Sequence, residues 1–256
     1  MKIVVSKDAK ALGCNAADYI AGLINEAIAK KGEARIILST GASQLTTLEP
    51  LIERDIDWSK VTMFHLDEYV DLPETHIASF RKYLKERFIQ KINLKAAHLV
   101  DGTPEGIAAL TAELRSAPID VGLIGIGENA HIAFNDPPAD FDTKEAYIVV
   151  NLNETCKKQQ VGEGWFATID DVPKQAVSMT VYQILQCEQI VSCVPYAVKA
   201  NAVRDTLEND KTNLIPATIM KGHKNFALFV DEDSFSKVDE SKIRPAEGVD
   251  YTVERA

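Results

Sequence analysis

The sequence predicts an α/β protein whose mostly parallel β-sheet is covered by helices on both faces. Short apolar runs alternate with longer amphipathic segments along nearly all of the 256 residues, as is typical of repeated βαβ units. Several of these runs are continuously apolar, which indicates strands that are buried on both sides. Polar clusters follow three of the runs, at the strand ends where parallel sheets usually bind ligands.

The expected elements follow one another in a regular order. Residues 3–5 form the first strand, and residues 8–31 show an apolar stripe at helical spacing that ends at Gly32, which predicts a long helix. Apolar runs predict further strands at 35–38, 61–66, 121–126, 146–150, 175–179, 189–194 and 226–230. Helical patterns predict helices at 45–54, 79–88, 106–115, 181–185 and 198–207. We expect one domain over residues 1–256, in which the irregular segment at about 137–172 forms a lid.

The composition limits the compartment and the partners. A chain of this length with 46% hydrophobic residues can bury one sizeable core. Its net charge of −10 argues against non-specific binding to nucleic acid or to anionic membranes. No apolar run approaches the ~18 residues of a membrane span, and the first residues lack the pattern of a signal peptide. The four cysteines lack the spacing of zinc sites and indicate reduced thiols in a cytoplasmic protein.

The first polar cluster is the sequence STGAS at residues 39–43. Small residues let backbone N–H groups face outward, and the N-terminus of the following helix favours an anion. The segment is similar to a phosphate cradle, although it lacks the lysine of a P-loop, and an ordinary helix N-cap would look the same. Its candidate binding residues are Thr40, Gly41, Ala42 and Ser43.

The second cluster is the sequence HLDEY at residues 65–69. Its adjacent carboxylates, Asp67 and Glu68, point to opposite sides of an extended chain. One of them can therefore face a ligand while the other faces the scaffold. Two solvated loop acids would give the same pattern, so both residues are candidates for the site.

The third cluster, within residues 119–136, is the most informative. An apolar run is broken by Gly125 and Gly127, and Asn129, His131 and Asp136 follow. A histidine with a carboxylate five residues away can be held in one tautomer and act as a general acid or base near neutral pH. A strand, a glycine turn and a satisfied loop histidine are the alternative. The histidines of the chain lack the helical spacing that zinc sites favour, so no metal is expected.

These clusters and two later segments resemble the glucosamine-6-phosphate deaminase/isomerase family, whose wider group includes the 6-phosphogluconolactonases. The resemblance rests on STGAS, HLDEYV and GIGENAHIAFNDP in this order, and on VPKQAVSMT at 172–180 and AVKA at 197–200. It spans nearly the whole chain, to about Asp231. It implies a modified doubly wound, Rossmann-like fold. It also implies the conversion of glucosamine 6-phosphate and water to fructose 6-phosphate and ammonia, without a metal or another cofactor.

The resemblance implies catalytic roles for four residues. Asp67 corresponds to the base that moves a proton between C2 and C1 of the sugar, and His131 to the acid/base that opens the sugar ring. Asn129 and Asp136 correspond to the polar partners of this histidine. Such a reaction needs a carboxylate beside the sugar carbons and a second group that protonates the ring oxygen.

Binding roles are implied as well. The loop at 41–43 and Lys199 correspond to the groups that hold the phosphate of a phosphorylated amino sugar, and Glu68 is a further expected substrate contact. The arginine that the family carries before a Phe-Phe pair is absent here. Lys157 or Lys158 is expected to replace its charge, as a point charge and not as a bidentate fork. Two solvated lysines are the alternative, and Lys158 is kept as a candidate phosphate ligand.

Two further departures concern the third cluster. Ala130 replaces the usual glycine before the histidine, so this turn either avoids a positive φ or accepts strain. Asp136 replaces a glutamate and is one methylene shorter. Two other functions stay open: a 6-phosphogluconolactonase-like hydrolase, and a non-catalytic sugar-phosphate sensor. A homo-oligomer is left open as well.

Overall fold

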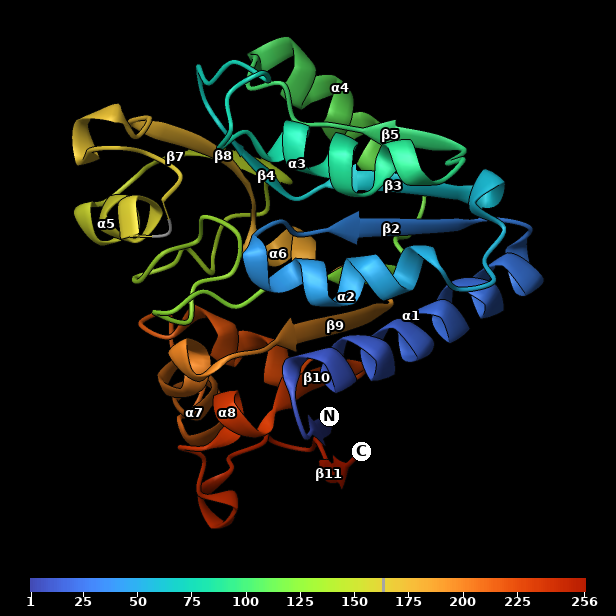
Figure 1. Ribbon diagram of the computed structural model, residues 1–256, viewed down its shortest axis with the longest axis vertical. Coiled ribbons are helices and arrows are strands. Elements are labelled where there is room, and N and C mark those ends of the chain that lie inside the picture. Colours follow the sequence, from blue (N-terminus) through green and yellow to red (C-terminus); the bar gives the residue numbers. More distant parts are fainter. Residues whose placement is uncertain (163) are drawn as a thin grey trace.

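The computed structural model describes residues 1–162 and 164–256 and contains an eight-stranded sheet. Its strands are β1 (Lys2–Ser6), β2 (Ala34–Leu38), β3 (Val61–His65), β5 (Ala96–His98), β6 (Val121–Leu123), β9 (Gln189–Val194), β10 (Phe226–Asp231) and β11 (Thr252–Arg255). They lie in the order β11-β1-β10-β9-β6-β2-β3-β5 (Figure 1). Every neighbouring pair is parallel. The predicted mostly parallel α/β fold is confirmed.

Helices cover both faces of this sheet. They are α1 (Ala9–Lys31), α2 (Ala42–Ile52), α3 (Phe80–Arg87), α4 (Pro104–Leu114), α5 (Glu154–Gly162), α6 (Val181–Ile184), α7 (Ala200–Glu208) and α8 (Glu232–Phe235). Short 3₁₀ helices are η1 (Trp58–Lys60), η2 (Ile89–Lys91), η3 (Ile169–Asp171), η4 (Ala197–Lys199), η5 (Pro216–Gly222) and η6 (Glu240–Lys242). One hydrophobic cluster packs α1, α2 and α3 against the sheet, and another packs α4, α6, α7 and α8.

The strands separate these two clusters because successive side chains point to opposite faces. In β2, for example, Ile36 and Leu38 belong to the cluster under α1, whereas Ile37 belongs to the other. All three side chains are fully buried. The continuous apolar runs of the sequence therefore reflect two cores, one on each side of a central sheet.

A second, antiparallel sheet lies beside the carboxyl end of β3. It consists of β4 (Asp67–Tyr69), β7 (Tyr147–Asn151) and β8 (Gln175–Met179) in the order β4-β8-β7. Only Leu66 separates β3 from β4. Asp67 pairs with Ser178 at the start of this sheet, and α5 lies next to β7 and β8 (Figure 1). The second sheet thus carries α5 to the edge of the large sheet where ligands are expected.

The structure confirms most of the expected elements and differs at a few ends. Helix α2 begins at Ala42, three residues earlier than expected, and β6 ends at Leu123, three residues earlier than expected. The sequence patterns missed β4, β5, β11 and α8, which have three or four residues each, and also α5. Among the described residues, no helix is both long and apolar enough to cross a membrane. The organisation as one domain stays a prediction, and Glu163 of the expected lid lies outside the described residues.

Candidate active site

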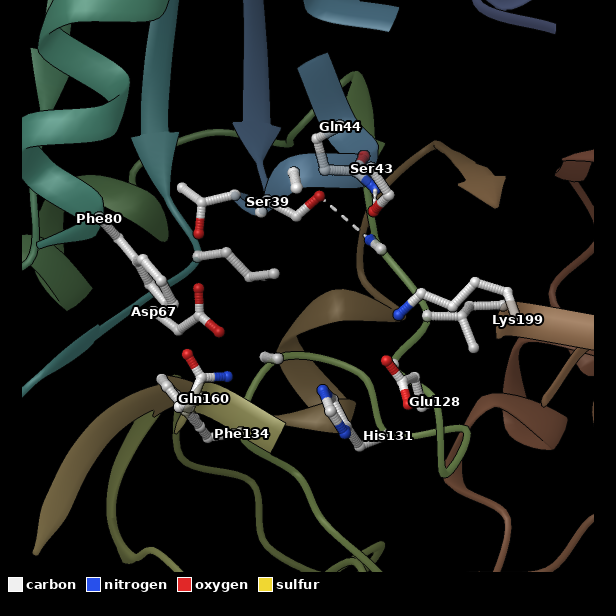
Figure 2. Close-up of a pocket in the computed structure, with 18 of the residues that line it drawn as sticks. Ser39, Ser43, Gln44, Asp67, Phe80, Glu128, His131, Phe134, Gln160 and Lys199 are labelled. Atoms are coloured by element: carbon white, nitrogen blue, oxygen red, sulfur yellow. Dashed lines mark hydrogen bonds between the residues drawn. The ribbon is translucent and has the colours of Figure 1, made fainter. Parts of the chain in front are cut away.

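A pocket of about 240 Å³ lies at the carboxyl ends of β2, β3, β6 and β9. These four strands are neighbours at the centre of the large sheet, in the order β9-β6-β2-β3. The loop after each of them supplies lining residues, and helix α5, which is carried by the second sheet, supplies Cys156 and Gln160. Such a crevice at the carboxyl ends of central strands is where open α/β sheets bind their ligands. Figure 2 shows the polar side chains converging on this space.

The predicted phosphate loop forms one wall of the pocket. Thr40, Gly41, Ala42 and Ser43 all line it. Gly41 has φ 116°, a conformation that favours glycine, and it stands directly before the first residue of α2. Tyr83 holds the loop by donating a hydrogen bond from its hydroxyl to the Gly41 carbonyl oxygen, at 2.9 Å. The N-terminus of the eleven-residue helix α2 therefore faces the pocket with a small, fixed loop, as anion sites require.

Lys199 approaches the pocket from the side of β9. It ends η4, which precedes α7, and its residue is only 8% exposed. Figure 2 shows its side chain pointing into the pocket between the start of α2 and Glu128, across from Asp67. The structure therefore brings the predicted phosphate lysine and the predicted phosphate loop to one pocket.

Asp67 occupies the opposite wall. It is the first residue of β4, is 6% exposed, and directs its carboxyl group into the pocket (Figure 2). Burial, with a contribution from the charge of Glu68, raises the pKa of Asp67 from 3.8 to about 8. A carboxylate with such a pKa is a much stronger base than a solvated one, which suits it to take a proton from carbon.

Glu68 points to the other side of β4, as the alternation of side chains along a strand predicts. Its carboxylate is fully buried and accepts hydrogen bonds from the Ser79 hydroxyl at 2.9 Å and from the backbone N–H groups of Phe80 and Arg81. It also forms an ion pair with Arg81 at 3.1 Å. The expected substrate contact of Glu68 is therefore wrong, because its oxygens hold the start of α3 and not the pocket.

Glu68→Gln is accordingly expected to lower stability and not catalysis. The variant loses the negative charge that accepts five hydrogen bonds, one of them from the backbone N–H of Tyr69, at a cost of about 1.5–3 kcal/mol. We expect a lower midpoint of chemical unfolding with a kcat of the folded protein close to the parent value. An unfolding midpoint equal to that of the parent, together with a raised KM, would instead show that Glu68 contacts the substrate.

His131 carries a hydrogen-bonded network at the third wall. Its Nδ1 lies 2.6 Å from Asn129 Oδ1 and 3.4 Å from Asp136 Oδ1. Asn129 in turn donates from Nδ2 to Asp136 Oδ1, at 3.1 Å. Because both neighbours of Nδ1 are acceptors, the network favours the proton on Nδ1 and leaves Nε2 to exchange a proton with a ligand. The predicted partners of the histidine are thus brought together.

The carboxylate of Asp136 stays ionised in this network. Burial alone would raise the pKa of Asp136, but hydrogen bonds from His131, Asn129 and Cys156 hold it below its ordinary value of 3.8. The negative Asp136 therefore stands beside the ring as an acceptor for Nδ1 and helps to hold the imidazole in one orientation.

The turn before His131 combines close contact with backbone strain. A Cβ atom at Gly127 would lie 2.1 Å from Cε1 of the His131 ring, so any other residue there would displace the ring. Ala130 has φ 60°, in the left-handed region. Of the two expected possibilities, avoiding a positive φ or accepting strain, the second is therefore the case. The alanine adopts the strained conformation, which costs of the order of 1–2 kcal/mol. Strain of this kind is common beside functional groups.

The remaining candidates lie away from the pocket. The Lys158 ammonium pairs with Glu154 at 3.4 Å, and its side chain is 63% exposed. Its expected phosphate contact is therefore wrong for this structure. His65 is fully buried beneath the strand end, where burial, together with the charge of Arg81, lowers its pKa to about 3. Within the described residues, no group of three side chains is placed to hold a metal ion.

Several lining residues were not singled out from the sequence. They are Ser39, Gln44, Glu128, Cys156 and Gln160. Gln44 donates from Nε2 to the Cys193 carbonyl oxygen and to Ser43 Oγ, at 3.2 Å in both cases. Ser39 accepts a hydrogen bond from the Gly125 N–H at 3.1 Å (Figure 2). The bonds of Gln44 to Cys193 and of Gly125 to Ser39 tie the phosphate loop to the ends of neighbouring strands. They join segments that are distant in the sequence, so no local pattern predicts them.

Comparisons with known proteins agree with this site. A sequence profile of the family described as glucosamine-6-phosphate isomerases/6-phosphogluconolactonase matches residues 7–228. A glucosamine-6-phosphate deaminase from Lactobacillus delbrueckii subsp. bulgaricus is 31% identical over 240 residues, which are 92% of this chain and 99% of that protein. One from Streptococcus uberis is 33% identical over 221 residues, covering 85% of this chain and 92% of its own.

Solved structures show the same relationship. A monomeric glucosamine-6-phosphate deaminase superposes with a TM-score of 0.84 at 28% identity, covering 93% of this chain and 100% of that one. A 6-phosphogluconolactonase from Shewanella baltica, at 22% identity and a TM-score of 0.74, shares the fold over 90% of this chain and 98% of its own. With the profile match across most of its length, this chain belongs to the glucosamine-6-phosphate isomerase/6-phosphogluconolactonase family.

Proposed function

We propose that this protein converts glucosamine 6-phosphate and water to fructose 6-phosphate and ammonia. The observation that carries this proposal is the single pocket in which Asp67, His131 and Lys199 meet. The pocket thus holds a buried base, a second acid/base and a cation beside a helix N-terminus. An aldose–ketose shift of a sugar phosphate needs these three groups.

His131 would open the sugar ring. In the closed sugar, Nε2 of His131 takes the proton of the C1 hydroxyl as the bond between C1 and the ring oxygen breaks, and it then passes this proton to the ring oxygen. Asp136 and Asn129 orient the ring through Nδ1, which leaves Nε2 for this transfer. The open chain then presents an aldehyde at C1 and an amine at C2.

Asp67 would move a proton from C2 to C1. Removal of the C2 proton places a double bond between C1 and C2 and a negative charge on the C1 oxygen. Return of the proton to C1 gives a protonated imine at C2, and one N–H proton of this group passes to the C1 oxygen, which becomes a hydroxyl. Water adds to this imine, and ammonia leaves. A carboxylate whose pKa is raised to about 8 by burial can take the proton and hold it until its return.

The remote phosphate would supply binding energy that fixes the reacting carbons against Asp67. The loop at 41–43 and Lys199 face that end of the pocket. The segment at 137–172 would act as the lid. Three of its described residues line the pocket: Cys156, Gln160 and Trp165. A lid of this kind excludes water from the reactive intermediate.

The test is ammonia release measured with glucosamine 6-phosphate, glucosamine and N-acetylglucosamine 6-phosphate. We expect turnover with the first, and a very low kcat/KM with glucosamine because it lacks the anchoring phosphate. Hydrolysis of 6-phosphogluconolactone, followed by proton release, is measured beside it. Lactone hydrolysis without ammonia release from any amino sugar would overturn the proposal, as would equal kcat/KM for the free and the phosphorylated amino sugar.

A further inference from the structure

Helix α5 places one polar side chain, Gln160, at the wall of the pocket that also holds Asp67. Gln160 is 8% exposed and lines the pocket. Its Oε1 accepts a hydrogen bond from the Tyr69 hydroxyl at 2.6 Å, in a buried position. Gln160 thus contributes a buried amide to the candidate active site, and the mechanism above gives this amide no role.

The Tyr69 hydroxyl fixes which way this amide points. Because Oε1 is taken up by the hydroxyl, the Nε2 group lies on the other side, and Figure 2 shows it directed into the pocket. Tyr69 is itself held firmly: it is 1% exposed, and its ring contacts those of Phe80, Phe134 and Phe166 at centroid distances of 5.1, 5.3 and 5.6 Å. The amide donor is therefore positioned before a ligand arrives.

The same strand positions the base and the residue that orients the amide. Asp67 and Tyr69 are two residues apart in β4, so their side chains leave the strand on the same face. Tyr69 reaches Gln160 on that face, and Asp67 and Gln160 line one pocket. A fixed N–H donor thus stands at the wall where Asp67 meets the substrate (Figure 2).

We propose that Gln160 is a catalytic residue that donates a hydrogen bond from Nε2 to the C1 oxygen of the open-chain substrate. This inference rests on the proposed function. When Asp67 takes the C2 proton, the electrons of the C2–H bond form the C1–C2 double bond, and the electrons of the C1 carbonyl move onto its oxygen. A donor fixed at that oxygen stabilises the developing negative charge without having to reorganise.

Two substitutions at residue 160 test the donor. Gln160→Met keeps the length of the side chain and removes the hydrogen bond. Gln160→Glu keeps its shape and replaces the donor by acceptors. Loss of one such donor typically lowers kcat about 10²–10³-fold, and we expect a decrease of this order in both variants, with a small change in KM. Gln175→Met is the matched control, because Gln175 is exposed and donates to Asn151 outside the pocket.

Tyr69→Phe tests the positioning. It keeps the aromatic packing and removes the hydroxyl that orients the amide, so we expect a smaller decrease in kcat, about tenfold. A second readout separates catalysis from a structural role. With substrate deuterated at C2, the isotope effect on kcat is expected to increase in Gln160→Met, because C2–H cleavage becomes more fully rate-limiting. A loosened α5 alone would not increase it.

The outcomes separate the inference from the function on which it rests. An active parent, with Gln160→Met and Gln160→Glu at near-parent kcat and an unchanged isotope effect, overturns the role of Gln160 alone. A parent that releases no ammonia overturns the proposed function and this inference with it. Binding of inorganic phosphate and the thermal unfolding midpoint are measured for each variant. A variant that neither binds phosphate nor shows a thermal unfolding transition is not folded and is excluded. The other substitution at residue 160 and Tyr69→Phe then test the inference.

Discussion

Asp67→Asn is expected to lower the turnover of glucosamine 6-phosphate by about 10²–10⁴-fold, the usual cost of removing a positioned base. The substitution keeps the size of the side chain and removes its basicity. Binding should change little, because the phosphate anchor lies across the pocket at the 41–43 loop and Lys199. The loss should therefore appear in kcat and in kcat/KM alike.

The same variant is expected to be more stable than the parent at neutral pH. The carboxyl of Asp67 has a pKa of about 8 in the folded chain and about 3.8 when unfolded. Between these values the folded chain keeps a proton that the unfolded chain has released, so the stability of the parent falls as the pH rises. The variant has no such group. Its advantage in unfolding free energy should grow from pH 4 to pH 8, to the order of a few kcal/mol.

Kinetics and unfolding at pH 5 and pH 8 check both parts of this prediction. Lys158→Ala serves as the control, because this side chain is 63% exposed and pairs with Glu154 away from the pocket. Ammonia release at the parent rate would remove Asp67 from the proton transfer. A stability difference between Asp67→Asn and the parent that does not change with pH would show that the folded carboxyl ionises normally.

The sequence predicted the parts of the site that are encoded locally. The phosphate loop and the His131 turn each follow an apolar run, and their glycines and polar residues stand within a few positions of each other. Because parallel strands carry their carboxyl ends to one edge, these clusters had to meet once the strands paired. The orientation of Asp67 and Glu68 was predicted only as an alternation. Which of the two faces the pocket depends on Ser79 and Arg81, which take up Glu68 from α3.

The contribution of α5 could not be predicted in the same way. Its sequence is mostly polar and carries no clear apolar stripe, so neither its helix nor its inward face is evident. Cys156 and Gln160 reach the pocket because the second sheet places α5 there, and their partners Asp136 and Tyr69 come from distant segments. The lysines at 157 and 158 illustrate the opposite case, because the sequence suggested that one of them supplies a positive charge to the site. In the structure, Lys158 lies at the surface and pairs with Glu154.

Lys199→Ala is expected to raise KM for glucosamine 6-phosphate by about 10²–10³-fold, with a much smaller effect on kcat. Lys199 is 8% exposed and shares the pocket with the N-terminus of α2, so its contact with a phosphate would be shielded from water. Loss of one partner from such a charged pair costs about 2–5 kcal/mol. Because the phosphate is remote from C1 and C2, the contact is the same in the ground state and the transition state, and its loss falls on KM.

A matched control separates this local contact from the net charge of the protein. Lys158→Ala removes the same charge from a side chain that is 63% exposed and paired with Glu154, where an ion pair contributes about 0–1 kcal/mol. We expect its KM to remain near the parent value. The effect of Lys199→Ala should also vanish for glucosamine, which has no phosphate to lose. If Lys158→Ala raised KM as much as Lys199→Ala, and the increase shrank at high salt, then α5 would supply the phosphate charge in the closed enzyme and the assignment of Lys199 would be wrong.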